Sequence, residues 1–217
     1  MKFLLAQINP VVGDLEGNAK KIIYIASKAS SISADFVLTP ELSLWGYPAN
    51  DLLLKKNLIK NQYQIINKLA FDINKKYGNL SITVGIAEII NDSFFPNLYN
   101  SIALLEGGEW KIIARKIFLP TYEVFDEKRY FRSEEKVSVL VKKIKNKTWR
   151  LGFTICEDLW VNKDIDGRGI HKKNPIFDLK KKKVDILVNL SASPYTFKKI
   201  ELDPKFPVLL LNIFKYR

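Results

Sequence analysis

Hydrophobic positions recur along this chain with two different periods, and these periods predict where helices and strands lie. From Leu15 to Ser30 the apolar positions follow helical spacing, and Leu52–Tyr77 does the same until Gly78-Asn79, which favours a helix end. Short apolar runs between turn residues predict strands. The predicted strands are Lys2–Ile8, Phe36–Leu38, Ile82–Ile90, Leu98–Leu105, Trp110–Arg115, Val137–Val141, Trp149–Ile155 and Val184–Leu190, with a third, short helix at Pro175–Lys182.

The order of these elements indicates a layered α/β protein. Helices and strands alternate at both ends of the chain, whereas strands follow one another in the middle, where Gly107-Gly108 predicts a hairpin turn. Such an order requires at least one mixed sheet, and helices must bury its apolar faces. The periodicity by itself defines no more than this fold class.

The composition supports a single compact domain. The chain has 217 residues, of which 47% are hydrophobic, enough for one full core. Its only cysteine, Cys156, excludes an internal disulfide and fits a reducing compartment. The polar break at Gln7 comes too early for a secretory signal, and no apolar stretch is long enough to span a bilayer. We therefore expect a cytoplasmic protein with no membrane partner.

The net charge of +12 raises the question of an anionic partner. The positive charge is mostly lysine in short clusters such as Lys180–Lys183, and no ladder of aromatic and basic residues accompanies it. A solvated surface is the favoured interpretation, and a phosphate-binding surface is the alternative. We do not expect a nucleic-acid partner.

The scarcity of some residue types excludes several chemistries. With one histidine and one cysteine, the chain cannot build a Cys/His zinc site, and we expect no metal. A Ser-His-Asp triad would need His171, which lies in a Lys- and Gly-rich stretch typical of an exposed loop. No Gly-rich phosphate loop is present, so we expect no cofactor in this domain.

Glu41, Lys116 and Cys156 each follow closely after a predicted strand, where α/β proteins commonly hold their sites. A thiol can attack an amide carbon if a base removes its proton. Without a usable histidine, a carboxylate such as Glu41 must be that base. Lys116 and the backbone N–H after the cysteine can stabilise the resulting oxyanion, each donor by roughly 3 kcal/mol.

Each of these three residues also has an ordinary structural interpretation. A lone cysteine at a strand end is often a small core residue. Glu41 can cap the element that follows it, and Lys116 can be a surface lysine. The pattern alone does not show that the three side chains meet in space.

The motifs around these residues resemble those of the nitrilase, or carbon–nitrogen hydrolase, superfamily. The glutamate motif is Pro40–Pro48 (PELSLWGYP), the lysine motif is Arg115–Pro120 (RKIFLP) and the nucleophile motif is Ile155–Trp160 (ICEDLW). The opening segment Leu5–Pro10 also fits. The order and separations agree too, with 75 positions from Glu41 to the lysine and 40 more to the cysteine. Three motifs in order are a much stronger signal than any one of them.

Within the superfamily, the chain is most similar to the glutaminase domain of glutamine-dependent NAD synthetases. The similarity lies in residues 119–131 (LPTYEVFDEKRYF), in Cys156-Glu157-Asp158 and in residues 189–194 (NLSASP). The resemblance implies a four-layer α-β-β-α sandwich. It also implies a Glu41–Lys116–Cys156 triad that forms a γ-glutamyl thioester on the cysteine.

The resemblance further implies a glutamine pocket and a partner. Glutamine would be held by Tyr122, Ser193 and Lys199, and the pocket would be lined or supported by Tyr47, Glu127 and Trp160. Core packing is the alternative for Tyr122 and Trp160, and a turn before Pro194 is the alternative for Ser193. In this family the ammonia passes to a synthetase domain that uses ATP and Mg, and full-length members commonly form homo-oligomers.

The chain departs from the family pattern after Lys199. Ile200–Phe206 leaves almost no room for the helix with which the family continues, and no synthetase sequence follows. We therefore interpret residues 1–217 as an incomplete glutaminase domain, truncated at its C-terminus. We expect it to be poorly stable alone, because apolar sheet surface would be exposed; a cooperative melt of soluble monomer would contradict this.

The leading hypothesis for function is the glutamine-hydrolysing part of an NAD synthetase. A stand-alone amidase or nitrilase and an inactive remnant are the alternatives.

Overall fold

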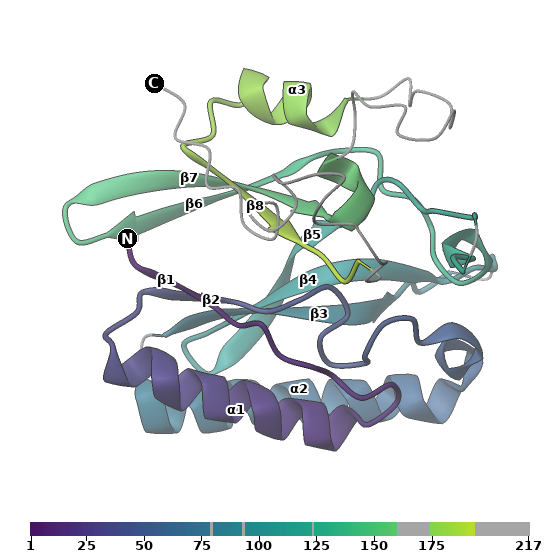
Figure 1. The fold of residues 1–217 in the computed structure, drawn as a ribbon, viewed down its shortest axis with the longest axis horizontal. Helices are drawn as coiled ribbons and strands as arrows, with labels where there is room; N and C mark the ends of the chain where they lie inside the picture. Colours follow the sequence, from purple (N-terminus) through teal and green to yellow (C-terminus); the bar gives the residue numbers. More distant parts are fainter. Residues whose placement is uncertain (79, 93, 123, 160–173, 194–217) are drawn as a thin grey trace, which may run out of the picture.

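Two stacked β-sheets lie between layers of helices in the computed structural model of this chain (Figure 1), which describes residues 1–78, 80–92, 94–122, 124–159 and 174–193. The first sheet has the strand order β1-β2-β3-β4-β5, and the second has the order β6-β7-β8. The strands are β1 (Phe3–Leu5), β2 (Phe36–Leu38), β3 (Ser81–Ile89), β4 (Leu98–Glu106), β5 (Glu109–Arg115), β6 (Ser138–Ile144), β7 (Lys147–Ile155) and β8 (Ile186–Leu190).

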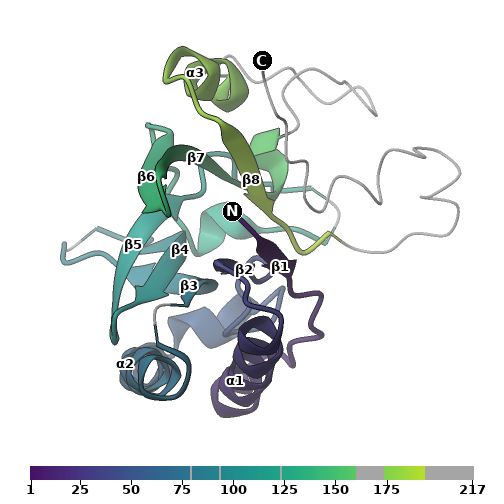
Figure 2. The same ribbon diagram turned by 90° about the vertical axis from the view of Figure 1, so that its left-hand side faces the viewer.

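Helices cover the outer face of each sheet. The helices α1 (Leu15–Ser31) and α2 (Lys56–Tyr77) lie side by side on the first sheet, and α3 (Pro175–Lys181) lies on the second, as Figure 2 shows from the side. This arrangement confirms the four-layer α-β-β-α sandwich that the resemblance implied.

The strand directions bring the carboxyl ends of several strands to the same end of the first sheet. The strands β1, β2 and β3 are parallel, and β3, β4 and β5 form antiparallel hairpins. Because β5 therefore runs parallel to β2, the segments that follow these two strands lie at the same end. In the second sheet β7 runs antiparallel to β6 and parallel to β8.

Apolar side chains fill both the space between the helices and the first sheet and the space between the two sheets. Ile22 of α1 and Leu69 of α2 belong to the first of these cores, which is the larger. Phe36, Leu104 and Phe153 belong to the second, where β2 and β4 of one sheet meet β7 of the other. A strand buried on both faces needs mostly apolar residues, which is why β2, and β8 apart from Asn189, show no alternation.

Several predicted boundaries differ from the observed ones, and two of these differences have identifiable reasons. The predicted helix Leu52–Tyr77 divides into a 3₁₀ turn, Asn50–Leu54, and α2, because Lys55 has an extended backbone (ψ 96°) that breaks the helix. The lysine-rich segment between the predicted strands Val137–Val141 and Trp149–Ile155 continues the ladder of β6 and β7 down to Ile144 paired with Lys147. Alternating exposure lets lysines face water on one side of a strand while the other side stays covered.

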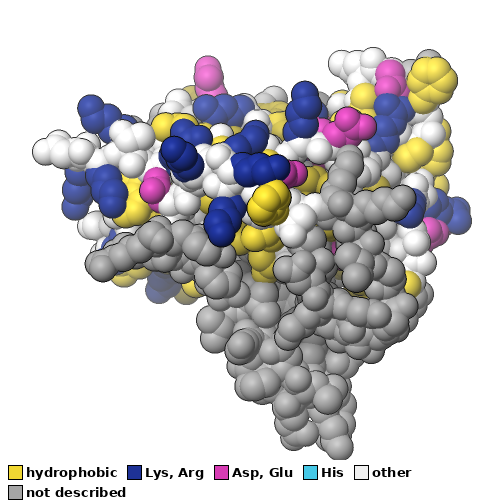
Figure 3. All heavy atoms as spheres, turned by 90° about the horizontal axis from the view of Figure 1, so that it is seen from above, with side chains coloured by type: hydrophobic (Ala, Val, Ile, Leu, Met, Phe, Trp, Pro, Cys, Tyr) yellow, Lys and Arg dark blue, Asp and Glu magenta, His cyan; other side chains and the backbone are white. Residues whose placement is uncertain are grey.

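The face formed by α3, β6 and β7 carries many of the lysines. Figure 3 views the molecule from this side and shows Lys and Arg side chains distributed among acidic and apolar ones. Lys143, Lys145 and Lys147 of the hairpin are exposed, as is the lysine run at the end of α3. Among the described residues, no helix is both long and apolar enough to cross a membrane.

Candidate active site

A buried ammonium between two carboxylates is the centre of the candidate site. Lys116 follows β5 and is fully buried, and its Nζ donates to Glu41 Oε1 at 2.7 Å and to Glu127 Oε1 at 2.7 Å. Burial lowers the pKa of Lys116, but the charges of Glu41, Cys156 and Glu127 outweigh this effect and raise its pKa well above the usual range. The lysine therefore stays charged. The alternative of a surface lysine is excluded.

Glu41 reaches this point through a tight turn after β2. The turn places Leu42 in the left-handed backbone region (φ 44°) and packs so closely on β3 that a Cβ on Gly85 would lie 2.2 Å from the Leu42 nitrogen. Glu41 Oε1 also accepts from Asn100 Nδ2 at 2.8 Å, and its Oε2 accepts from the Ala192 N–H at 3.3 Å. Its carboxylate is thus held from three different segments.

Cys156 comes from the other sheet, directly after β7. It begins the 3₁₀ turn Cys156–Leu159 (η3) with a left-handed backbone (φ 47°), which is costly for a residue with a Cβ. Its backbone oxygen accepts from Asn189 Nδ2 at 3.2 Å. Cys156 lies near enough to Glu41, Lys116 and Glu127 for their charges to act on its thiol, although it comes from the other sheet.

The protonation of Cys156 decides what chemistry is open to it. Burial and the Glu41 charge raise the pKa of its thiol to about 12, although Lys116 and a hydrogen bond from Ser191 act in the opposite direction. At neutral pH the resting residue is therefore a thiol and needs a base when it attacks. Glu41 supplies a carboxylate in the same cluster.

Glu127 and Tyr47 complete the cluster around Lys116. The Tyr47 hydroxyl donates to Glu127 Oε1 at 2.7 Å, and its ring lies 5.9 Å from Lys116 Nζ. Burial raises the pKa of Glu127 to about 7, even though Lys116 favours the ionised form. Burial and the nearby carboxylates also raise the pKa of Tyr47, so it acts as a neutral donor.

The remaining residues implied for the glutamine pocket are only partly placed. The Tyr122 hydroxyl lies 3.4 Å from Glu157 Oε2, on the residue next to the cysteine, and Ser193 lies on the segment after β8 that also reaches Glu41. Lys199 and Trp160 lie outside the described residues. His171 lies outside them as well.

Three polar residues support the site without having been singled out from the sequence. Asn100 lies in β4 and contacts Glu41, Asp158 lies in η3, and Asn189 lies in β8 and contacts Cys156. Each is at most 5% exposed. Asn189 interrupts the otherwise apolar run of β8, and that interruption was the available signal, because a buried polar group requires a partner. Asn100 and Asp158 stand next to other polar residues, Ser101 and Glu157, so no such interruption marks them.

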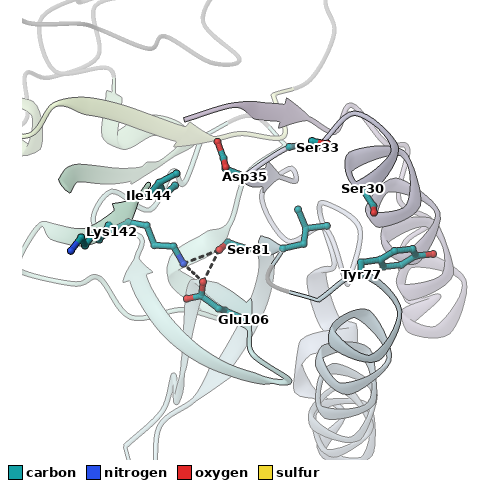
Figure 4. A pocket seen from close by; sticks show the side chains of 11 residues that line it. Ser30, Ser33, Asp35, Tyr77, Ser81, Glu106, Lys142 and Ile144 are labelled. Carbon is teal, nitrogen blue, oxygen red and sulfur yellow. Dashed lines mark hydrogen bonds and ion pairs between the residues drawn. The ribbon is translucent and has the colours of Figure 1, made fainter. Parts of the chain in front are cut away.

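A pocket of about 480 Å³ lies at the opposite end of the sandwich (Figure 4), lined by residues that include Asp35, Tyr77, Ser81, Glu106 and Lys142. Three of its polar side chains contact one another. Lys142 Nζ contacts Glu106 and donates to Ser81 Oγ at 3.0 Å, and Ser81 donates to Glu106 at 2.8 Å.

Buried polar atoms without a hydrogen-bond partner lie at the end of the molecule that holds Glu41 and Lys116. Within the described part of the chain, the two buried side-chain atoms that lack a hydrogen-bond partner are Asn100 Oδ1 and Glu127 Oε2. Both belong to residues that contact the Glu41–Lys116 pair. Unsatisfied buried acceptors favour this cluster over the pocket as the functional site.

Known proteins share both the sequence and the fold. A glutamine-dependent NAD(+) synthetase from Synechocystis is 40% identical over 195 residues, which are 88% of this chain and 34% of that protein. The structure of the Acinetobacter baumannii glutamine-dependent NAD+ synthetase in complex with ADP is 32% identical, with a TM-score of 0.76, and covers 96% of this chain and 35% of that one.

An amidase of the nitrilase superfamily from Nesterenkonia matches with a TM-score of 0.70 at 17% identity, over 97% of this chain and 70% of that one. This likeness concerns the fold alone. The chain spans about a third of the length of the curated relatives that it matches.

The match to a family is continuous along the chain. Residues 5–203 match the carbon–nitrogen hydrolase family, and this range includes the three motifs around Glu41, Lys116 and Cys156. With this match and relatives at up to 40% identity, the resemblance to the nitrilase superfamily is confirmed. The chain therefore belongs to the carbon–nitrogen hydrolase family.

Proposed function

We propose that this chain hydrolyses the side-chain amide of glutamine and supplies the ammonia for NAD synthesis. One observation carries the proposal: a permanently charged lysine is held between two carboxylates beside a cysteine whose thiol is protonated at rest. Cleavage of an amide C–N bond needs these groups, namely a nucleophile, a base and a fixed cation. The curated relatives with this sequence pattern are glutamine-dependent NAD(+) synthetases.

In the proposed mechanism, Glu41 takes the Cys156 proton as the sulfur bonds to the amide carbon. Negative charge then develops on the amide oxygen, which Lys116 and the backbone N–H after the cysteine stabilise. Glu41 returns its proton to the leaving nitrogen, the C–N bond breaks, and ammonia departs from a γ-glutamyl thioester. Water, deprotonated by the same carboxylate, hydrolyses the thioester to glutamate and restores the thiol.

The neighbouring residues have supporting roles in this proposal. Glu127 and Tyr47 hold Lys116 so that its ammonium points toward the reacting atoms. Tyr122, Ser193 and Lys199 hold glutamine, and Trp160 lines or supports the pocket. A zwitterionic amino acid needs a cation for its carboxylate and acceptors for its ammonium, which a lysine and hydroxyl groups provide.

We further propose that the ammonia passes to a synthetase domain or subunit, where ATP and Mg support the amidation that makes NAD. The likeness to a synthetase solved with ADP supports this partner. Assembly into homo-oligomers and a cytoplasmic location belong to the same proposal.

Covalent trapping tests the proposal. The chain is incubated with 6-diazo-5-oxo-norleucine, a reactive glutamine analogue, and mass spectrometry locates the adduct. We expect one adduct on Cys156, ammonia release from glutamine, and the loss of both in Cys156→Ala. Ammonia release from simple amides or nitriles but not from glutamine would favour a stand-alone amidase. Neither adduct nor turnover in folded protein would favour an inactive remnant.

A further inference from the structure

Asp158 links the two segments that carry Lys116 and Cys156. Its Oδ1 accepts from the backbone N–H groups of Ile117 at 3.0 Å and Phe118 at 2.7 Å. Its Oδ2 accepts from the Ile155 N–H at 3.0 Å. The first two residues directly follow the lysine, and the third directly precedes the cysteine.

This link joins different sheets of the sandwich. Ile117 and Phe118 lie in the irregular segment after β5 of the first sheet, whereas Ile155 ends β7 of the second. Asp158 is 1% exposed, so water does not compete for its three hydrogen bonds. One carboxylate thus fixes the lysine segment relative to the cysteine turn.

The link also acts where the backbone is strained. Asp158 holds the N–H just before Cys156, and Asn189 holds the carbonyl of Cys156 itself. A left-handed conformation at a residue with a Cβ persists only when the surroundings determine it from several sides. The two contacts meet that requirement on either side of the strained residue.

We propose that Asp158 is a positioning residue, which sets the separation between Lys116 and Cys156 by bonding the backbone of both segments. The proposal rests on the proposed glutaminase function for its catalytic consequence. Asp158 does not contact the reacting atoms in this proposal. It acts through the lysine, whose charge favours the thiolate and stabilises the oxyanion only at short range.

The exchange Asp158→Asn tests this role, because it keeps the shape and removes half of the acceptors. An amide has one oxygen, so its NH₂ group must face an N–H of one of the two segments. We expect the kcat for glutamine to fall 10- to 100-fold, with KM changed less than threefold. We also expect the pH profile of Cys156 alkylation by iodoacetamide to shift upward, because the lysine charge lies farther from the sulfur.

A matched control is Asp185→Asn. Asp185 also accepts a backbone N–H of β7, from Arg150 at 2.7 Å, but near the middle of the strand and away from the cysteine turn. We expect this variant to lose some stability yet to keep kcat within twofold per folded molecule and the alkylation profile unchanged. A folded Asp158→Asn variant that behaves like this control would overturn the proposal.

The two readouts separate the two proposals. If the wild-type chain releases no ammonia from glutamine, the glutaminase proposal fails, while the alkylation profile still tests the link. If Asp158→Asn does not fold, hydrogen exchange of the wild-type chain tests whether Asp158 holds the two segments. The Ile117, Phe118 and Ile155 amides should then exchange as slowly as those in the middle of β7, and faster exchange at all three overturns the proposal.

Discussion

At the level of single residues, the candidate site concentrates buried charge in an arrangement that favours chemistry over stability. Two carboxylates, Glu41 and Glu127, share the one ammonium of Lys116, and all three residues are less than 5% exposed. Desolvating such groups costs several kcal/mol per ion, and their mutual attraction repays this only in part. Burial raises the pKa of the second carboxylate, Glu127, and the charge of the shared Lys116 offsets this only in part.

Replacing Glu41 by Gln tests the base. The amide keeps the size of the side chain but cannot take the Cys156 proton, so the thiol with its raised pKa stays protonated. We expect kcat/KM for glutamine to fall by about 10²–10⁴-fold, the range for a general base. Ammonia release under saturating and limiting glutamine measures this fall in kcat/KM. Glu109→Gln, at an exposed position of β5, is the matched control and should change nothing; a Glu41→Gln variant that keeps a tenth of the activity contradicts the assignment.

The raised pKa of Glu127 predicts how stability depends on pH. The folded chain holds this proton up to about pH 7, whereas the unfolded chain releases it near the usual glutamate pKa of 4.5. The folded state therefore binds more protons between these values, and the free energy of unfolding should fall as pH rises, by up to roughly 1.4 kcal/mol per pH unit. Urea unfolding at pH 5, 6, 7 and 8 measures the slope. Burial raises the pKa of Asp158 to about 7 as well, so Glu127→Gln should reduce the slope without abolishing it; an equal slope in both proteins would show that Glu127 does not contribute to it.

At the level of elements, the sequence predicts which strands end in reactive residues but not which segments touch. Glu41, Lys116 and Cys156 can be predicted because each lies in a motif that follows an apolar run. Both the motif and the run are read from neighbouring residues. The contact of Gly85 with the Leu42 turn and the bond from Asn100 to Glu41 join residues about 40 to 60 positions apart. Neither contact has a local period. The predicted range of the lysine-rich strand β6 ends too early, at Val141, for the same reason. Its pairing with β7 extends the strand to Ile144 despite its lysine-rich composition.

The close approach of β3 to the Glu41 turn makes Gly85 sensitive to a single methyl group. A Cβ would lie 2.2 Å from the Leu42 nitrogen and 2.9 Å from the Glu41 carbonyl carbon, so the backbone of the turn must move. We expect Gly85→Ala to lower the free energy of unfolding by about 3 kcal/mol or more and to reduce kcat in the molecules that remain folded. Thermal melts and ammonia release measure both effects.

Gly107→Ala provides the control for backbone strain. This glycine has a left-handed φ of 63°, but nothing lies within 4 Å of an added Cβ. Alanine there should cost about 1–2 kcal/mol from strain alone and leave kcat unchanged. If Gly85→Ala cost no more than Gly107→Ala, the close contact would not be important for the turn.

At the level of the whole molecule, the candidate site exists only where the two sheets meet. The first sheet contributes Glu41 and Lys116, and the second contributes Cys156, so the packing between the sheets sets the geometry of the reaction. The core between the helices and the first sheet supports the fold but carries no reactive residue. Defects in the two cores should therefore differ in their effect on activity even where they are equal in their effect on stability.

The same substitution in each core tests this distinction. Leu104 of β4 lies between the sheets and Leu69 of α2 lies between helix and sheet, and both are almost fully buried. Leu→Ala should lower the free energy of unfolding by about 2–5 kcal/mol at either position. Per folded molecule, only Leu104→Ala should reduce kcat, by about tenfold, because a cavity between the sheets lets the cysteine turn shift relative to Lys116. Urea unfolding gives the folded fraction, and single-turnover trapping of the thioester gives the rate. Equal rates in the two variants would mean that the site tolerates movement between the sheets, and that local contacts alone hold Cys156 against the lysine.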